Sequence, residues 1–252
     1  MKTDGELRCE SLRLHFDGVC ALSGVTLAFP AGKVTAIIGP NGAGKTTLLH
    51  VLTGFLRPDG GRTYLGRREI SSLPPFRIAQ LGVGRTFQDL RLILGISVLD
   101  NLLLAFPRQQ GEGLLSALTP TSFRREERLN RQTALLLLQQ LGLEGFSGQA
   151  AGTLSYGQQK LLSLACCLAT GASVLLLDEP VAGVDPEMSA KILKILTDCR
   201  ADGKTVVFVE HDITAVRQVA DWLVVMDEGK VIAEGEPREV LRLPEIMEAY
   251  LA

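Results

Sequence analysis

The sequence predicts an α/β domain built on a mostly parallel sheet, with an inserted helical segment. Three short runs, residues 34–38, 173–177 and 205–209, are apolar almost throughout, and strand-like and helix-like segments alternate around them. Continuous apolar runs of this length are typical of parallel strands that are buried on both faces. The first thirty residues alternate apolar and polar side chains, which indicates a small antiparallel β-layer ahead of the main sheet.

Length and composition limit the possible domain organisation and class of the protein. Its 252 residues permit one large α/β domain with a smaller one inserted, and the formal net charge of −2 argues against nonspecific nucleic-acid binding. No apolar window reaches the length of a membrane span and the start lacks the pattern of a signal peptide, so we expect a cytosolic chain. The mean hydropathy of +0.20 indicates some apolar surface kept for a partner.

The five cysteines suggest neither a disulfide framework nor a zinc site, because their number is odd and no two have C-x-x-C spacing. We interpret Cys9, Cys20, Cys166, Cys167 and Cys199 as buried thiols in a reducing compartment.

The antiparallel layer begins with two predicted strands. Leu12, Leu14 and Phe16 alternate with polar residues, residues 25–29 form a second β-rich run, and Asp17-Gly18 can form the turn between them. Phe16 has the flat apolar ring that stacking on a purine base requires. A lone aromatic is more often part of a core, so the residue by itself leaves both interpretations open.

A glycine-rich loop follows the first buried strand. It matches the pattern G-x-x-x-x-G-K-S/T with Gly39, Pro40, Asn41, Gly42, Ala43, Gly44, Lys45, Thr46 and Thr47. Glycines let the backbone wrap a polyphosphate, so that amide N–H groups and the start of the next helix face the anion. Lys45 then reaches the β- and γ-phosphates and the Thr46 hydroxyl ligates Mg²⁺. Strand, loop and helix in this order predict nucleotide binding.

The middle of the chain changes character. We expect a strand and turn at 62–66, a short helix that Pro74-Pro75 opens and that ends near Leu81, and a strand at 83–88. This strand ends in Gln88, whose amide can coordinate a cation or orient a water.

Residues 97–160 then contain two helix patterns and no convincing strand. In the second, Ala134, Leu137, Leu138 and Leu141 follow the i, i+3, i+4, i+7 period, and the charged run 124–128 at its start is interpreted as a solvated face. We therefore expect a helical insertion at 97–160 between core segments 1–96 and 161–252.

Two carboxylates follow the second buried strand. Asp178 is placed to hold Mg²⁺, and Glu179 could polarise an attacking water. His211 lies at the carboxyl end of the next buried strand, and ligands of open α/β sheets collect at that edge. We therefore expect Lys45, Asp178, Glu179 and His211 to converge.

The remaining elements are a helix, a hairpin and a closing helix. Asp185 and Pro186 have the residue types of an N-cap and a first helical position. Residues 222–226 and 230–234 read as a hairpin about Glu228-Gly229, and 244–251 as an amphipathic helix.

A seven-residue stretch distinguishes this chain from other nucleotide hydrolases. Leu154, Ser155, Tyr156, Gly157, Gln158, Gln159 and Lys160 resemble the L-S-G-G-Q signature of ATP-binding cassette (ABC) ATPases, which also precedes the strand with the paired carboxylates by one helix. The resemblance covers essentially the whole chain. It implies a P-loop NTPase cassette with a RecA-like core, an antiparallel β-subdomain and an inserted α-helical subdomain, which hydrolyses ATP with Mg²⁺.

The resemblance also implies roles for single residues. Phe16 would stack on adenine, Gln88 would be the Q-loop glutamine, 182–185 the D-loop and His211 the switch histidine. The implied metal ligands are Thr46, Gln88 and Asp178, and the implied catalytic groups are Glu179, His211, Gln88 and Lys45. Because ABC ATPases pair head to tail, Ser155, Gly157, Gln158 and Asp185 would complete the nucleotide site of a second cassette.

Within this family, the chain looks most like the ATPase subunits of branched-chain amino acid importers. The similarity is carried by 82–88, 97–105, 156–159 and 248–251. Urea and short-amide importers share much of the pattern, and a lipid or lipopolysaccharide exporter cassette is a further alternative. Cassettes that act on DNA or ribosomes carry long coiled coils or tandem cassettes, which this sequence does not have.

Two departures from the family pattern stand in and after the signature. Tyr156 replaces the first glycine of the signature, which leaves Ser155 and Gly157 to bind phosphate. Cys166 and Cys167 stand where an arginine and an alanine are usual, which removes a basic side chain.

The resemblance implies partners as well. These are two membrane-spanning permease subunits, a second ATPase subunit that is either a copy or a related chain, and, indirectly, a solute-binding protein outside the cell. The chain would sit peripherally on the cytoplasmic face of the cell membrane and bind no nucleic acid. A groove between the Gln88 segment and the helical insertion would receive a permease helix.

Overall fold

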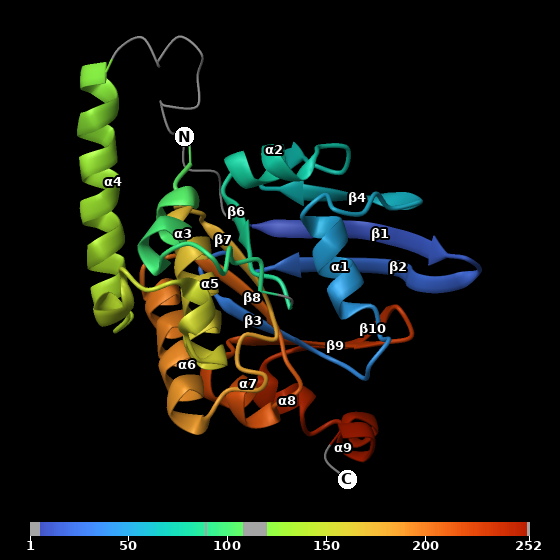
Figure 1. The fold of residues 1–252 in the computed structure, drawn as a ribbon. Helices are drawn as coiled ribbons and strands as arrows, with labels where there is room; N and C mark the ends of the chain where they lie inside the picture. Colours follow the sequence, from blue (N-terminus) through green and yellow to red (C-terminus); the bar gives the residue numbers. More distant parts are fainter. Residues whose placement is uncertain (1–5, 89, 108–119, 251–252) are drawn as a thin grey trace. The chain divides into compact units, whose positions relative to one another are not determined.

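The computed structural model describes residues 6–88, 90–107 and 120–250 (Figure 1). The chain forms two compact units, one made of residues 1–88 and 173–252 and the other of 89–172. The second unit is therefore inserted between two segments of the first.

A six-stranded sheet forms the centre of the first unit. Its strands are β3 (Val34–Ile38), β6 (Val83–Arg85), β7 (Val174–Asp178), β8 (Thr205–Val209), β9 (Trp222–Asp227) and β10 (Lys230–Gly235). Their order is β10-β9-β3-β8-β7-β6, and only the β9–β10 pair is antiparallel. Every residue of β3, β7 and β8 is buried, which confirms the prediction from the continuous apolar runs.

A four-stranded antiparallel sheet forms the predicted β-layer. Its order is β2-β1-β4-β5, with β1 (Leu7–Phe16), β2 (Val19–Phe29), β4 (Gly60–Leu65) and β5 (Arg68–Glu69). Asp17 and Gly18 both have positive φ, at 43° and 89°, as this two-residue hairpin turn needs. The two sheets meet where the Ser23 N–H donates to the Gly229 carbonyl oxygen at 2.8 Å.

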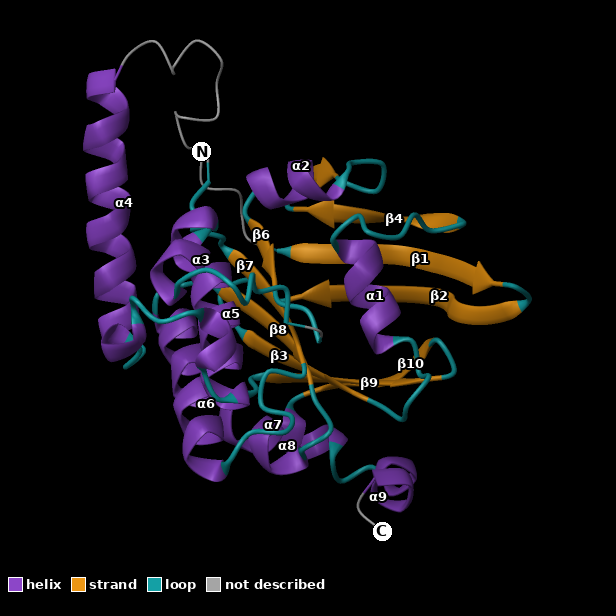
Figure 2. Cartoon of the chain, viewed as in Figure 1, coloured by secondary structure: helices purple, strands orange, loops and turns teal. Residues whose placement is uncertain are grey.

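The first unit also contains helices. They are α1 (Lys45–Leu52), α2 (Pro75–Gln80), α6 (Pro186–Ala201), α7 (Ile213–Val219), α8 (Pro237–Val240) and α9 (Pro244–Tyr250). Figure 2 shows α6 beside α7, and α6 packs against β3 and β8. Asp185 caps α6 as predicted, since its Oδ1 accepts from the Met188 N–H at 2.9 Å. No described helix has the length and apolar composition that crossing a membrane requires.

One predicted strand is shorter than expected. The strand expected at 83–88 ends at Arg85, because β6 is an edge strand that pairs only with the first half of β7, and Gln88 lies beyond it. The closing helix begins at Pro244 as predicted, and Leu251, its predicted last residue, lies outside the described residues.

The second unit is helical. It contains α3 (Val98–Leu104), α4 (Pro120–Gln140) and α5 (Tyr156–Ala169). Of the four predicted periodic positions, Ala134, Leu138 and Leu141 are buried and Leu137 is half-buried, and Leu141 lies directly after α4. The unit is wider than the predicted segment 97–160, because α5 continues to Ala169 and packs against α3 and α4. α4 also begins four residues before the charged run. Three residues of that run, Arg125, Glu127 and Arg128, are exposed.

A buried asparagine joins the loop before α3 to that helix. Asn101 accepts from the Ile93 N–H at 2.8 Å and donates to the carbonyl oxygens of Ile93 and Ser97, both at 3.0 Å. Because all three bonds go to backbone groups, the Asn101 side chain fixes the loop at Ile93 against the start of α3.

The prediction that all five cysteines are buried was wrong for two of them. Cys9, Cys167 and Cys199 are buried, but Cys20 is exposed and Cys166 is half-buried. Cys20 stands just after the hairpin turn between β1 and β2, where the strands extend past the core. Burial raises the pKa of Cys166 to about 12, so this thiol stays protonated at neutral pH.

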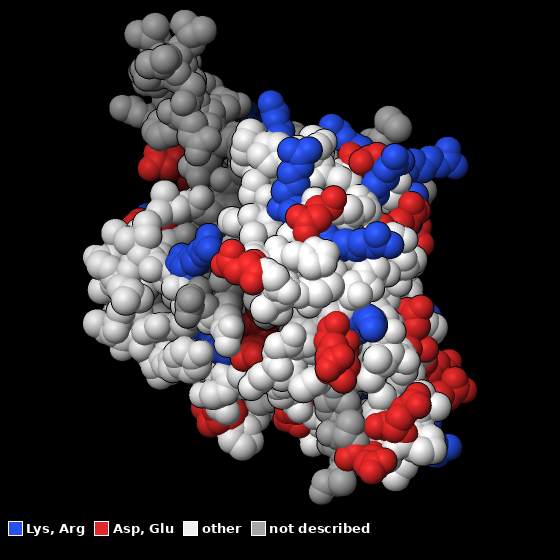
Figure 3. Space-filling view, turned by 90° about the vertical axis from the view of Figure 1, so that its right-hand side faces the viewer, with Lys and Arg blue, Asp and Glu red and all other residues white. Residues whose placement is uncertain are grey.

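Charge of both signs is spread over the surface. Figure 3 shows one face on which Lys and Arg gather toward the top and Asp and Glu toward the bottom. This mixture agrees with a formal net charge of only −2.

Candidate functional site

The glycine-rich loop has the backbone shape of an anion cradle. Gly42 and Gly44 have φ of 84° and 94°, and a Cβ on Gly44 would lie 2.5 Å from the Ala21 carbonyl oxygen. Only glycine adopts that conformation so close to another backbone. Gly44 precedes α1 and has no side chain to cap the first N–H groups of the helix, so these donors can face a bound anion.

Lys45 is held over its own loop. Its Nζ donates to the carbonyl oxygens of Gly39 at 2.7 Å and Pro40 at 2.9 Å. Within the described part of the chain the third N–H of the ammonium has no acceptor, so it can donate to an anion in the loop. Burial lowers the pKa of Lys45, and the carboxylates of Glu179 and Asp178 oppose that shift.

Thr46 and Asp178 form the pair expected of a cation site. The Thr46 Oγ1 donates to Asp178 Oδ1 at 3.3 Å. A hydroxyl and a carboxylate are the oxygen ligands that Mg²⁺ prefers. Among the described residues no three His, Cys, Asp or Glu side chains come together as a metal cluster. The residues present therefore fit this ion.

Arg85 was missed by the sequence reasoning, although it lies in the segment that ends at Gln88. Its Nη2 donates to Asp178 Oδ2 at 3.2 Å, and the two side chains are only 4% and 1% exposed. Burial raises the pKa of Asp178, and the Arg85 charge and hydrogen bond oppose this shift. The signal that could have found Arg85 is an arginine directly after the apolar start of a predicted strand.

Glu179 contacts two other predicted catalytic residues, His211 and Gln88. Its Oε1 lies 3.2 Å from the His211 Nε2, and its Oε2 accepts from the Gln88 Nε2 at 3.4 Å. With Glu179 ionised, the first contact is a hydrogen bond when His211 carries a proton on Nε2. A carboxylate, an imidazole and an amide thus lie together just past the ends of β6, β7 and β8.

Glu210 is a second residue to which the sequence reasoning gave no role. It directly precedes His211 and is 2% exposed. Its two carboxylate oxygens accept from the backbone N–H groups of Val181 at 2.8 Å and His211 at 3.2 Å. Its signal in the sequence is an acid directly after a strand that is apolar almost throughout.

Phe16 lies outside the buried core. It ends β1, and 43% of its surface is exposed. Such an exposed ring can stack on a flat ligand.

Ser155, Gly157 and Gln158 belong to the helical unit. They form the start of α5, where the Ser155 Oγ accepts from the Gln158 N–H and the Gln158 Oε1 accepts from the Ser155 N–H, a capping box. The side chain of Tyr156 is half exposed, and the Lys160 ammonium lies 5.4 Å from the centre of its ring. The part expected of these residues in a partner's site stays a prediction.

The ion pair of Arg85 and Asp178 supports a prediction about stability. Arg85→Met should lower the free energy of unfolding by about 3–5 kcal/mol, because it leaves a buried carboxylate without its counter-charge. The difference in unfolding free energy between the variant and the wild type should become smaller as the pH falls below neutrality. Burial raises the pKa of Asp178, and the protonated carboxyl group needs no partner. Urea unfolding at several pH values measures both effects.

The control for this measurement is Arg77→Met, which removes an exposed arginine of the same unit and should change stability by less than about 0.5 kcal/mol. Equal stability of the two variants would contradict the prediction.

Comparison with known proteins places the chain in a family. The ABC transporter family profile matches residues 22–182. The branched-chain amino acid transport ATP-binding protein BraF of Pseudomonas aeruginosa is 39% identical over 97% of both chains, and the LivG protein of Escherichia coli is 36% identical over the same shares.

Solved structures agree with these relatives. A nucleotide-free ATP-binding cassette from an ABC transporter superimposes with a TM-score of 0.84 at 35% identity, and an ADP conformation of such a cassette with 0.83 at 36%, each over 98% of both chains. With the loop, the signature and the paired carboxylates in place, the chain belongs to the ABC transporter family, as one of its ATP-binding cassettes.

Proposed function

We propose that this chain hydrolyses ATP as the nucleotide-binding subunit of a membrane importer for branched-chain amino acids. The observation that carries the ATPase assignment is the contact of Glu179 with Gln88 and His211, because it joins a general base to two groups that can hold a water and a phosphate. The solute class rests on the names of the relatives, both of which are branched-chain amino acid transport proteins.

In this proposal the loop and α1 hold the nucleotide. The backbone N–H groups of the loop 39–47, all except at Pro40, which has none, surround the β- and γ-phosphates, and the remaining N–H of Lys45 donates to them. Thr46, Asp178 and Gln88 would hold Mg²⁺, which neutralises charge on the phosphates when bound. Phe16 stacks on the adenine ring.

Glu179 then acts on the water that attacks the γ-phosphate. Its carboxylate orients this water and accepts its proton, and Gln88 donates to the water or to Glu179. His211 contacts the γ-phosphate and keeps the Glu179 carboxylate in place through the 3.2 Å contact. Catalysis here is positioning and charge stabilisation.

A single chain supplies half of each site. Two cassettes pair head to tail, so that Ser155, Gly157 and Gln158 of one chain complete the cradle of the other, with Asp185 at the contact. The chain carries the full set of catalytic groups, and both a pair of identical chains and a pair with a related chain are chemically competent. Two permease subunits hold the pair at the cytoplasmic face of the membrane, and a solute-binding protein delivers the amino acid to them.

Glu179→Gln tests the assignment of the base. The amide keeps the shape but cannot accept a proton, so turnover should fall about 10²-fold or more while ATP still binds. The negative charge that repels the γ-phosphate is also lost, and the variant should elute from gel filtration with ATP and Mg²⁺ as a dimer. Glu239→Gln, on the exposed surface of α8, is the matched control. Turnover equal to that of the control would refute the role of Glu179.

Phe16→Ala tests adenine stacking. Loss of the ring should weaken ATP binding by about 1 kcal/mol, close to fivefold, because stacking contributes that much beyond area burial. Isothermal titration calorimetry measures the change, with Phe76→Ala, another exposed ring, as the control. Unchanged affinity together with a clear loss of thermal stability would indicate a packing role for Phe16.

The solute class is tested with the whole transporter. We expect the chain, reconstituted in proteoliposomes with the permease subunits encoded beside its gene and their solute-binding protein, to hydrolyse ATP faster when leucine, isoleucine or valine is present. Labelled leucine should accumulate only when ATP is on the cassette side. Stimulation by urea or by a lipid in place of these amino acids would overturn the solute assignment.

A further inference from the structure

Glu210 joins the two segments that carry the proposed base and the switch histidine. One carboxylate oxygen accepts from the Val181 N–H, two residues after Glu179, and the other from the His211 N–H. The side chains of Glu179 and His211 are also in contact, since the His211 Nε2 lies 3.2 Å from the Glu179 Oε1. Glu210 therefore links, through backbone, the segment that carries Glu179 to His211, and the side chains of those two residues are in contact.

The backbone at Glu179 needs such a link. Glu179 has a φ of 49°, in the left-handed region that non-glycine residues rarely adopt. Residues persist there only where their surroundings hold them. The Glu179 N–H donates to the Val209 carbonyl oxygen at 3.0 Å, which fixes one side of the turn, and the bond from Val181 to Glu210 fixes the other side.

We propose that Glu210 is a positioning residue for ATP hydrolysis. By holding the N–H groups of Val181 and His211, it keeps the turn at Glu179 closed and sets the distance between the Glu179 carboxylate and the His211 ring. This inference rests on the proposed function, because it gives Glu210 its effect through Glu179. Glu210 itself does not act on the nucleotide.

The chemistry of the side chain makes the proposal specific to a carboxylate. Both oxygens of a carboxylate accept hydrogen bonds, and N–H donors bind an ionised acceptor more strongly than a neutral one. A glutamine offers one oxygen and one NH₂ group, so one of the two N–H donors would face another donor. Glu210→Gln therefore keeps the shape and breaks the link at one of its two ends.

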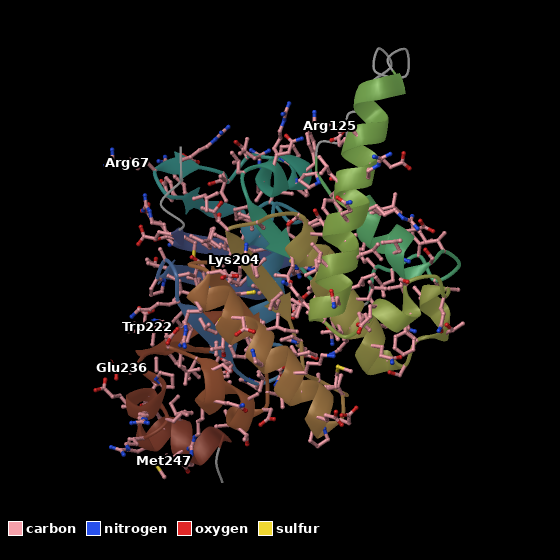
Figure 4. The ribbon with its side chains drawn as sticks, turned by 90° about the vertical axis from the view of Figure 1, so that its left-hand side faces the viewer. Arg67, Arg125, Lys204, Trp222, Glu236 and Met247 are labelled. Atoms are coloured by element: carbon pink, nitrogen blue, oxygen red, sulfur yellow. The ribbon has the colours of Figure 1, made fainter. Side chains whose placement is uncertain are left out.

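A matched carboxylate lies at the other end of the same sheet. Asp221 precedes β9, next to the Trp222 labelled in Figure 4, and its Oδ2 accepts from the Val34 N–H at 2.9 Å. Its Oδ1 accepts from Arg200 at 2.6 Å. Val34 begins β3, so Asp221 also joins two segments of the sheet, but at the amino ends of the strands and away from Glu179. Asp221→Asn is therefore the control for a merely structural effect.

The first measurement is hydrogen exchange of the nucleotide-free, full-length chain. Glu210→Gln or Glu210→Asp should speed exchange at the Val181 or His211 amide by about tenfold, the loss of one hydrogen bond to a charged acceptor. Asp221→Asn should speed exchange at Val34 and leave Val181 unchanged. Unchanged exchange at both Val181 and His211 in the Glu210 variants would overturn the proposal.

The second measurement is steady-state ATPase activity. In Glu210→Gln, kcat should fall about 10- to 100-fold, because small displacements of catalytic groups have effects of this size, while KM for ATP stays within about threefold. Glu210→Asp keeps the carboxylate but shortens the side chain. Its kcat should lie between that of the wild type and that of Glu210→Gln. Asp221→Asn should keep kcat within about twofold of the wild type. A fall in kcat that is equal in Glu210→Gln and Asp221→Asn would show a structural effect only.

A double variant shows whether Glu210 acts through Glu179. In single-turnover experiments, adding Glu210→Gln to Glu179→Gln should lower the remaining rate by no more than about twofold, because residues that act as a unit are not additive. If Glu210→Gln lowered the single-turnover rate by the same factor in the wild type and in Glu179→Gln, Glu210 would act independently of Glu179, and the proposal would be wrong. Failure of the proposed function is a separate result, since Glu179→Gln alone would then have no effect on turnover.

Discussion

The buried pair of Arg85 and Asp178 is the interaction on which the rest of the site depends. Asp178 ends β7 and holds Thr46, at the start of α1, through a hydrogen bond from its hydroxyl. Arg85 holds the other oxygen of Asp178 and also donates to Thr53, directly after α1, at 3.1 Å. The start of α1 is therefore bonded to the Asp178 carboxylate directly, and the residue after its end is joined to the same carboxylate through Arg85. A buried ion pair is costly to form, but it fixes a single geometry when each partner has further hydrogen bonds.

Strain and polar links are concentrated at the carboxyl ends of the parallel strands. Glu179 leaves β7 in a left-handed conformation, and the segment after it is held by Glu210, which follows β8. Because neighbouring parallel strands end side by side, two residues far apart in the chain can share hydrogen bonds there. Arg85, Asp178 and Glu210 are buried at this edge, so their charges act more strongly than they would in water.

Polar side chains of the helical unit form hydrogen bonds with backbone groups of the same unit. Ser155 and Gln158 cap α5, and Asn101 ties the loop before α3 to that helix. The Ser155 hydroxyl and the start of α5 are thus ordered by hydrogen bonds within the helical unit itself.

The amino-acid sequence alone determined the fold class, the glycine-rich loop, the paired carboxylates and the family, because these depend on local patterns. A run of apolar residues becomes a buried strand wherever it is packed, and glycines at fixed spacing allow the loop at Gly42 and Gly44 whatever surrounds it. Predictions at strand ends were less accurate, since the end of β6 depends on how far its neighbour β7 continues to pair.

Only the tertiary structure decided which side chains meet. Arg85 and Asp178 are 93 positions apart, and Glu210 and Val181 are 29 apart. No periodicity in the sequence relates such residues, because their contact depends on the order in which the strands lie in the sheet. That order places β7 between β6 and β8, and so brings Arg85, Asp178, Glu179 and Glu210 to one edge.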